Sequence, residues 1–173
     1  MDAGAQRPRV KIRDAAADDL PAIVEIFNQN VQSRLSVATT EPFAVEDRRT
    51  WFEEHDPSRR PIWVIEEERI IGWLSLSDFY DARPAYHATA EVGVYIHQDH
   101  QGKGLGRRLV EEAIGRAPGL GLKTLTAGIF AHNERSVALF RGFGFETWAH
   151  FPRVAELDGV EIDLLVLGLR IEP

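Results

Sequence analysis

Apolar residues recur with two periods along the chain, and the period separates predicted strands from predicted helices. Continuous or alternating apolar residues predict strands over residues 10–13, 61–65, 70–77, 91–96, 122–130 and two runs around Asp158-Gly159. Apolar residues three or four positions apart predict helices from Leu20 to Val31, over 45–54, over 105–117 and after Asn133. Strands and helices alternate along one chain, which indicates an α/β (α+β) fold.

Two connections between these elements are candidates for loops beside a site. Residues 33–43, SRLSVATTEPF, lack a helical period and are rich in Ser and Thr, which predicts a loop. Residues 79–90, FYDARPAYHATA, lead into the strand at 91–96. Their proline, aromatic and arginine content suits a loop that covers a pocket, and a simple hairpin connection explains them equally well.

A glycine-rich turn, QGKGLG at residues 101–106, separates the strand at 91–96 from the next helix. Gly102, Gly104 and Gly106 have no Cβ, so the backbone can approach a ligand and point N–H groups at an anion. Dinucleotide loops need a third glycine at a spacing that is missing here. Triphosphate loops need Ser or Thr after Lys103, where Gly104 stands. The turn therefore predicts a site for another phosphate-bearing cofactor.

Length and composition favour one compact unit. The chain has 173 residues, of which 44% are hydrophobic, enough for one sizeable core. We expect a loose leader at 1–9 and a single domain at 10–173. No apolar run approaches the roughly 20 residues that span a bilayer. The first ten residues lack the apolar centre of a secretion signal, so a cytoplasmic protein without a membrane partner is expected.

Net charge, cysteine content and histidine spacing limit which partners, acyl-transfer routes and metal sites are expected. A net charge of −7 disfavours nucleic acid as the main partner. The chain has no cysteine, so any acyl transfer must use another residue or go directly to the acceptor. His97, His100 and His132 flank the predicted site, but no spacing with a carboxylate or thiol partner supports a metal centre. No metal is therefore expected.

The stretch from Gln101 to Gly106 resembles the acetyl-CoA motif of the GNAT superfamily of N-acetyltransferases, Gln/Arg-x-x-Gly-x-Gly/Ala, and matches it completely. A second landmark lies downstream, where NERSVALF at 133–140 leads to Gly144-Phe145, similar to the family's Asn-x-x-Ser-x-x-Leu-Tyr and Gly-Phe. The resemblance implies the GNAT fold over about residues 10–169. That fold has a mixed, mostly antiparallel sheet that is splayed at the acetyl-CoA site and flanked by helices.

The resemblance also implies which residues bind acetyl-CoA. The corresponding positions are Val94, Tyr95, Ile96, Gln101, Gly102, Lys103, Gly104, Leu105, Gly106, Arg107, Asn133, Ser136 and Phe140. Val94 to Ile96 would act through backbone groups, one N–H stabilising the developing oxyanion. Asn133 is also a good helix N-cap, and Lys103 and Arg107 are also explained as solvated helix residues.

Phe140 departs from the family pattern, because many members have there a Tyr that protonates the departing CoA thiolate. A phenyl ring has no proton to donate. A free thiol has a pKa near 8.5, so its thiolate is only a moderately poor leaving group near neutral pH and water can serve as the acid. The substitution therefore does not exclude catalysis.

The details look most like the phosphinothricin and methionine-sulfoximine acetyltransferase branch. The carrying residues are Phe27-Asn28, Arg48 with Trp51-Phe52, and Glu91 four positions before Tyr95. In that branch a Glu at the position of Glu91 is the general base on the acceptor ammonium, directly or through water. An amine attacks a thioester only when neutral, so a base is needed, and burial would raise the pKa of Glu91 towards working pH. A solvated strand glutamate is the alternative.

A small amine acceptor and a homodimer are further implications of this resemblance. The candidate acceptor residues are Phe27, Arg34, Phe79, Arg83 and Tyr86. A chain of net charge −7 needs a local cation to hold an acidic acceptor, which Arg83 or, in reserve, Arg34 would supply. An exposed, uninvolved Arg83 is the alternative. Two other functions stay open, acetylation of a protein N-terminus and an acyl-CoA-binding sensor without turnover.

Overall fold

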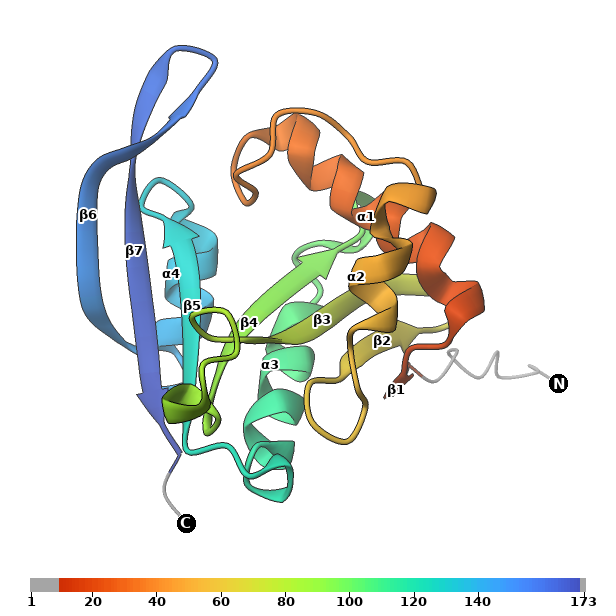
Figure 1. The fold of residues 1–173 in the computed structure, drawn as a ribbon. Helices are drawn as coiled ribbons and strands as arrows, with labels where there is room; N and C mark the ends of the chain where they lie inside the picture. The colour runs from red at the N-terminus through yellow and green to blue at the C-terminus, as the bar shows by residue number, and fades with distance from the viewer. Residues whose placement is uncertain (1–9, 172–173) are drawn as a thin grey trace, which may run out of the picture.

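The computed structural model describes residues 10–171, which build one seven-stranded sheet with helices on both faces (Figure 1). In spatial order the strands are β1 (Lys11–Asp14), β2 (Ile62–Glu66), β3 (Ile70–Asp78), β4 (Thr89–Ile96), β5 (Thr124–Phe130), β7 (Val160–Arg170) and β6 (Glu146–Leu157). Neighbouring strands are antiparallel except β4 and β5, which are parallel. The predicted mixed sheet is confirmed, whereas the expected leader at 1–9 lies outside the described residues.

The helices cover the sheet in two layers. α1 (Leu20–Ser33) and α2 (Arg49–Glu53) lie on one face, and α3 (Leu105–Arg116) and α4 (Glu134–Arg141) lie on the other (Figure 1). Ile62 and Val64 of β2 pack in the cluster that includes α1, while Trp63 and Ile65 pack in the cluster that includes α3. Both faces of β2 are thus buried, which explains why its sequence is continuously apolar instead of alternating.

Two predicted boundaries are wrong. The helix expected over residues 45–54 is a 3₁₀ turn at Glu46–Arg48 followed by the five-residue α2. Thr, Trp and Phe, which make up most of α2, are weak helix formers, and packing on the sheet holds this short helix. The strand expected from residue 122 begins at Thr124, because the N–H of Leu122 donates to the Ala117 carbonyl and closes the turn after α3.

The connection between β3 and β4 is a folded loop between antiparallel neighbours. It contains a 3₁₀ turn at Pro84–Tyr86 and three consecutive left-handed residues, Tyr80 (φ 48°), Asp81 (φ 55°) and Ala82 (φ 57°). Arg60, only 3% exposed, holds the two ends of this loop together. Its Nε donates to Asp78 Oδ1 at 2.8 Å and its Nη2 to the His87 carbonyl at 2.8 Å. A tight hairpin connection is therefore not what the chain forms.

The β6–β7 hairpin forms one edge of the sheet. Trp148 lies over Gly168, where a Cβ would come within 2.1 Å of the indole ring. The large apolar side chains exposed on this hairpin are Trp148, Phe151, Val154 and Val160. Within residues 10–171, no helix has the length and apolar character needed to cross a bilayer.

Candidate active site

The sheet opens between β4 and β5, and Glu91 stands where it opens. The two strands pair only over Thr89–Glu91 and Thr124–Thr126. Beyond that point β4 stays with β3, while β5 stays with β7. The predicted splay is therefore confirmed. It leaves the β5-facing backbone groups of β4 after Glu91 without a strand partner among the described residues.

Glu91 lines a small cavity of about 80 Å³ in this opening. Its Oε1 lies against Gly128 of β5, 3.5 Å from the place a Cβ would take there. The side chain reaches solvent through the open mouth, yet protein surrounds the carboxylate, and this burial raises the pKa of Glu91 above its usual value. No hydrogen bond or ion pair to another described residue opposes the shift. Such a carboxylate is suited to accept a proton.

Tyr95 shares the face of β4 with Glu91, as the alternation predicted, and its ring lies back along the strand over Gly93. A Cβ at Gly93 would stand 3.3 Å from Cε2 and 3.7 Å from Oη of Tyr95. The phenol therefore points towards Glu91. Burial, with the Glu91 charge adding to it, raises the pKa of Tyr95 to about 12, so the phenol is protonated at neutral pH. Trp73 and Phe27 contact its ring, with centroids at 4.5 and 5.4 Å.

The glycine turn adopts backbone angles that favour glycine. Gly102 and Gly104 have φ of 76° and 77°, which residues with a Cβ rarely adopt. Gly104 is the N-cap of α3, so free N–H groups and the positive helix end face a cavity of about 370 Å³. All predicted cofactor residues except Tyr95, Lys103 and Phe140 line this cavity, and Tyr95 and Phe140 line the adjoining smaller one.

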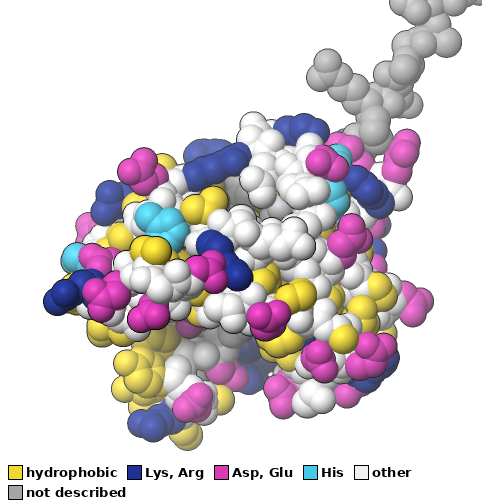
Figure 2. Space-filling view, turned by 90° about the horizontal axis from the view of Figure 1, so that it is seen from above, with side chains coloured by type: hydrophobic (Ala, Val, Ile, Leu, Met, Phe, Trp, Pro, Cys, Tyr) yellow, Lys and Arg dark blue, Asp and Glu magenta, His cyan; other side chains and the backbone are white. Residues whose placement is uncertain are grey.

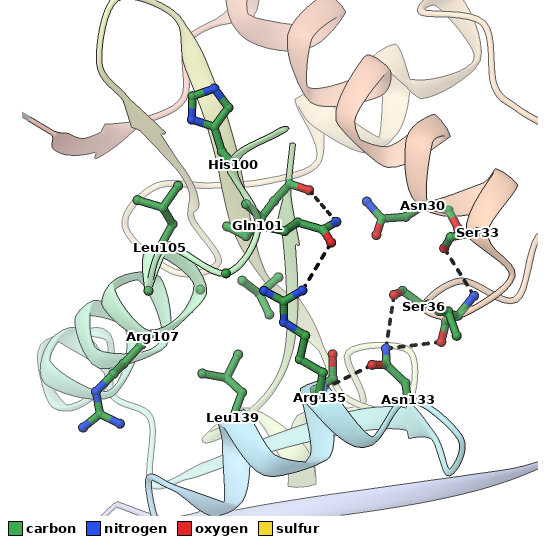
Figure 3. Close-up of a pocket in the computed structure, with 17 residues that line it drawn as sticks. Asn30, Ser33, Ser36, His100, Gln101, Leu105, Arg107, Asn133, Arg135 and Leu139 are labelled. Carbon is green, nitrogen blue, oxygen red and sulfur yellow. Dashed lines mark hydrogen bonds between the residues drawn. The ribbon is translucent and has the colours of Figure 1, made fainter. Parts of the chain in front are cut away.

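Asn133 lies at the start of α4 and lines the larger cavity. Its Oδ1 accepts from the Ser136 N–H at 3.2 Å and caps α4. Its Nδ2 donates to the Leu35 carbonyl at 3.3 Å and to Ser36 Oγ at 3.2 Å, which connects α4 to the loop after α1 (Figure 3). The loop at 33–43 therefore forms one wall of the cavity.

Sequence reasoning missed several residues of the larger cavity. They are Asn30, Ser33, Leu35, Ser36, His100, Arg135 and Leu139. Arg135 reaches across from α4, where its Nη1 donates to Gln101 Oε1 at 3.4 Å (Figure 3). Its place beside Ser136 in the second motif was the available signal. Asn30 and Ser33 come from α1, and nothing in the sequence around them indicates that they lie beside the glycine turn and the start of α3.

Three predicted cofactor residues are placed differently from the rest. Lys103 does not line either cavity. The guanidinium of Arg107 extends away from the cavity in Figure 3 and lies 4.7 Å from the centroid of the Phe143 ring. Phe140 is 2% exposed and packs edge-on against Phe145, with ring centroids 5.0 Å apart. The side chain at the family's tyrosine position is thus part of the core.

The predicted acceptor residues fall into three groups. Phe27 packs beside Tyr95, whereas Phe79 and Tyr86 contact each other in the β3–β4 loop, with centroids 5.5 Å apart. Arg83 is exposed in the same loop. Arg34 is engaged elsewhere, because its Nε donates to Asp158 Oδ2 at 2.8 Å and ties α1 to the β6–β7 turn. Among the described residues, no cluster of three metal-ligating side chains occurs.

Comparison with known proteins agrees with this geometry. The model of the acetyltransferase (GNAT) family matches residues 22–145. The Bacillus subtilis (strain 168) protein "Putative phosphinothricin acetyltransferase YwnH" is 46% identical over 91% of this chain and 96% of its own length. An L-methionine sulfoximine/L-methionine sulfone acetyltransferase of Pseudomonas aeruginosa is 33% identical over 94% and 95%.

Solved structures show the same relationship. The phosphinothricin acetyltransferase of Sinorhizobium meliloti, crystallised with acetyl-CoA, superposes with a TM-score of 0.88 at 27% identity, covering 94% of this chain and 88% of that one. The expected resemblance, the fold and the class of enzyme are thereby confirmed. The chain belongs to the acetyltransferase (GNAT) family, and is an acetyl-CoA-dependent N-acetyltransferase.

Proposed function

We propose that the protein transfers acetyl from acetyl-CoA to the primary amine of a small amino-acid-like acceptor, of the phosphinothricin or methionine sulfoximine kind, by direct attack. The observation that carries this proposal is Glu91, a carboxylate of raised pKa with no hydrogen-bond or ion-pair partner among residues 10–171, where β4 leaves β5. The relatives named for phosphinothricin and methionine sulfoximine cover nearly the whole chain, which supports the acceptor class.

Acetyl-CoA supplies the reactive thioester, and the residues lining the larger cavity would hold it. The turn at 101–106 and the start of α3 offer N–H groups to its pyrophosphate. Val94 to Ile96 offer backbone groups on the open side of β4, where an N–H can stabilise the oxyanion. The cavity has walls from β4, from the start of α3 and from α4, and the pantetheine arm would lie between them.

In the reaction, Glu91 takes a proton from the acceptor ammonium, directly or through one water. The neutral amine then attacks the thioester carbonyl, a C–N bond forms, the C–S bond breaks, and the surplus proton on the nitrogen passes to water. Water protonates the departing thiolate, because Phe140 has no proton to give. Tyr95 keeps its own proton at neutral pH and points towards Glu91, so its hydroxyl is available to orient the bridging water or the amine.

The acceptor is proposed to carry an acidic group that Arg83 holds. Acidic and basic side chains are interspersed over the face seen in Figure 2, so no broad positive field is there to attract an anion. The side chain of Arg83 makes no hydrogen bond or ion pair within residues 10–171, and Arg60 anchors its loop. Its guanidinium is therefore free to bind a carboxylate or phosphinate bidentately.

The test of the function is a panel assay that follows release of free thiol from acetyl-CoA. The protein itself has no cysteine to react with the thiol reagent. We expect turnover with phosphinothricin, methionine sulfoximine or related amino acids, and none with their N-acetyl forms. Turnover with peptide N-termini alone would replace this proposal by the protein N-terminal alternative. Acetyl-CoA binding without turnover on any amine would favour the sensor.

Arg83→Ala tests the acceptor contact. We expect KM for an acidic amine to rise by a factor that corresponds to about 1.5–3 kcal/mol of binding free energy, because one charged hydrogen-bonding partner is lost. KM for the amide or ester of the same acceptor should change far less. Equal losses for acidic and neutral acceptors would leave Arg83 without a role in binding.

A homodimer is part of the same proposal. The exposed apolar side chains of the β6–β7 hairpin offer a surface that a second copy could cover. Light scattering at several concentrations would measure the mass, and a monomer at all of them would contradict this part.

A further inference from the structure

Arg48 occupies a cage of aromatic rings on the face of the sheet that carries Glu91. Its guanidinium carbon lies 4.2 Å from the ring centroid of Trp51, 5.0 Å from that of Phe43 and 5.7 Å from that of Phe27. The three rings come from α2, from the loop at 33–43 and from α1 respectively. The cage therefore depends on three segments that meet only in the folded protein.

The charge of Arg48 has no anionic partner within the described residues. Other partly or fully buried arginines have one: Arg13 pairs with Asp19, and Arg60 pairs with Asp78. Arg48 has neither an ion pair nor a hydrogen bond from its side chain, and burial lowers its pKa, with Tyr95 opposing the shift. Arginine stays charged all the same.

Rings that cover a guanidinium face leave its N–H donors free, because all five lie in the guanidinium plane. A partly buried cation without a counter-charge is costly for the protein to maintain. A ligand anion that accepts these donors would remove that cost. The same contacts would orient the anion, because the rings fix the plane in which the donors point.

The cage adjoins the proposed acceptor site through a continuous row of contacts. Phe27, one wall of the cage, packs on Tyr95 at 5.4 Å between centroids. The Tyr95 ring lies over Gly93 and points to Glu91, and Glu91 precedes Gly93 by two strand positions, roughly 6–7 Å. Tyr95 thus stands between Glu91 and the Phe27 wall of the cage, and an acceptor that reaches both Glu91 and Arg48 would lie along Tyr95.

We propose that Arg48 is a specificity-determining residue that binds an oxyanion at the far end of the acceptor. This inference rests on the proposed function and deepens it: with Arg83 holding one acidic group and Arg48 a second, the preferred acceptors are amino acids that carry an additional acidic or strongly polar oxygen group on the side chain. A purely structural cage that ties α2 to α1 would predict no such preference.

The test uses Arg48→Met, whose unbranched side chain keeps contact with the rings and removes the charge. Arg49→Met is the matched control, because Arg49 is the exposed neighbour on α2. Phosphinothricin is titrated by calorimetry into each protein in the presence of CoA, which cannot transfer acetyl. Its side-chain phosphinate ester is the neutral comparison ligand.

We expect Arg48→Met to weaken phosphinothricin binding roughly 10–100-fold, the loss typical of one hydrogen-bonded charged partner. Binding of the ester and of CoA should change little, and Arg49→Met should resemble the wild type. In turnover assays the loss should appear in KM for the anionic acceptor and leave kcat nearly unchanged. Arg48→Lys, which keeps the charge but not the planar donors, should fall between the two and carries the test if Arg48→Met does not fold.

Equal weakening of phosphinothricin and its ester, or a lower melting temperature with unchanged affinity, would overturn the proposal and leave a structural cage. So would wild-type protein that binds neither ligand. If the wild type binds phosphinothricin and Arg48→Met does not, but no acetyl is transferred, the subsite stands and the proposed function fails. The calorimetric and turnover measurements therefore separate the two failures.

Discussion

Replacing Glu91 by Gln tests the proposed base with little disturbance of the structure. The amide has nearly the shape of the carboxylate, and Glu91 has no hydrogen bond or ion pair with described residues that the change would break. Acetyl-CoA affinity should therefore stay at the wild-type value. Turnover should fall by about 10²–10⁴-fold, which corresponds to about 3–5 kcal/mol of activation free energy.

The pH dependence gives a second measurement on the same variant. Burial raises the pKa of Glu91, so wild-type activity should fall as pH drops through that raised value, because the protonated acid cannot accept a proton. Glutamine does not titrate, so the acidic limb due to residue 91 should be absent from the residual activity. Thiol release, measured with saturating acetyl-CoA from about pH 5 to about pH 9, gives both profiles.

The contribution of Glu91 to folding stability should depend on pH in the opposite sense to its contribution to activity. A carboxyl whose pKa is higher in the folded state than in the unfolded state contributes stability below its unfolded pKa, and this is lost as pH rises through the folded value. The Gln variant lacks that loss. Its melting temperature relative to the wild type should therefore increase as pH rises, most clearly above the raised pKa.

Glu68→Gln is the matched control, because Glu68 is exposed in the turn between β2 and β3. It should leave turnover, its pH profile and the melting temperature nearly unchanged. Wild-type turnover in Glu91→Gln would refute the reasoning, and would mean that solvent removes the proton and that Glu91 is a structural residue. Loss of acetyl-CoA binding in that variant would equally contradict it.

Two further predictions concern glycines. Gly104→Glu should abolish acetyl-CoA binding in calorimetry, because φ of 77° disfavours a side chain and the new carboxylate would repel pyrophosphate at the start of α3; unchanged affinity in a folded variant would remove the cofactor assignment. Gly168→Ala should destabilise the protein by about 1–3 kcal/mol, because its Cβ would meet Trp148 at 2.1 Å. Thermal unfolding should show a melting temperature lower by roughly 2–10 °C, and Gly168→Ala combined with Trp148→Ala should recover part of it.

The sequence determined the features that depend on neighbouring residues. The positive φ angles at Gly102 and Gly104 suit a glycine turn that opens a helix. The Asn133 cap follows from a side-chain amide at the start of a helix, which accepts from the N–H of Ser136 three residues later. Both landmarks of the family are of this kind. The alternation that places Tyr95 on the same face as Glu91 is also local, since it needs only the twofold period of a strand.

Tertiary structure decided which distant side chains meet. Arg34 is a possible acceptor residue by sequence, but it pairs with Asp158, 124 positions away. By sequence, Arg48 is one of several charged residues in a predicted helix. In the fold, its guanidinium lies over the rings of Phe27 and Phe43. The raised pKa of Glu91 likewise depends on burial of its carboxylate, to which Gly128 of β5 contributes. A local pattern sets backbone angles and faces, whereas burial and counter-charges depend on segments that packing brings together, which is why the sequence alone did not show them.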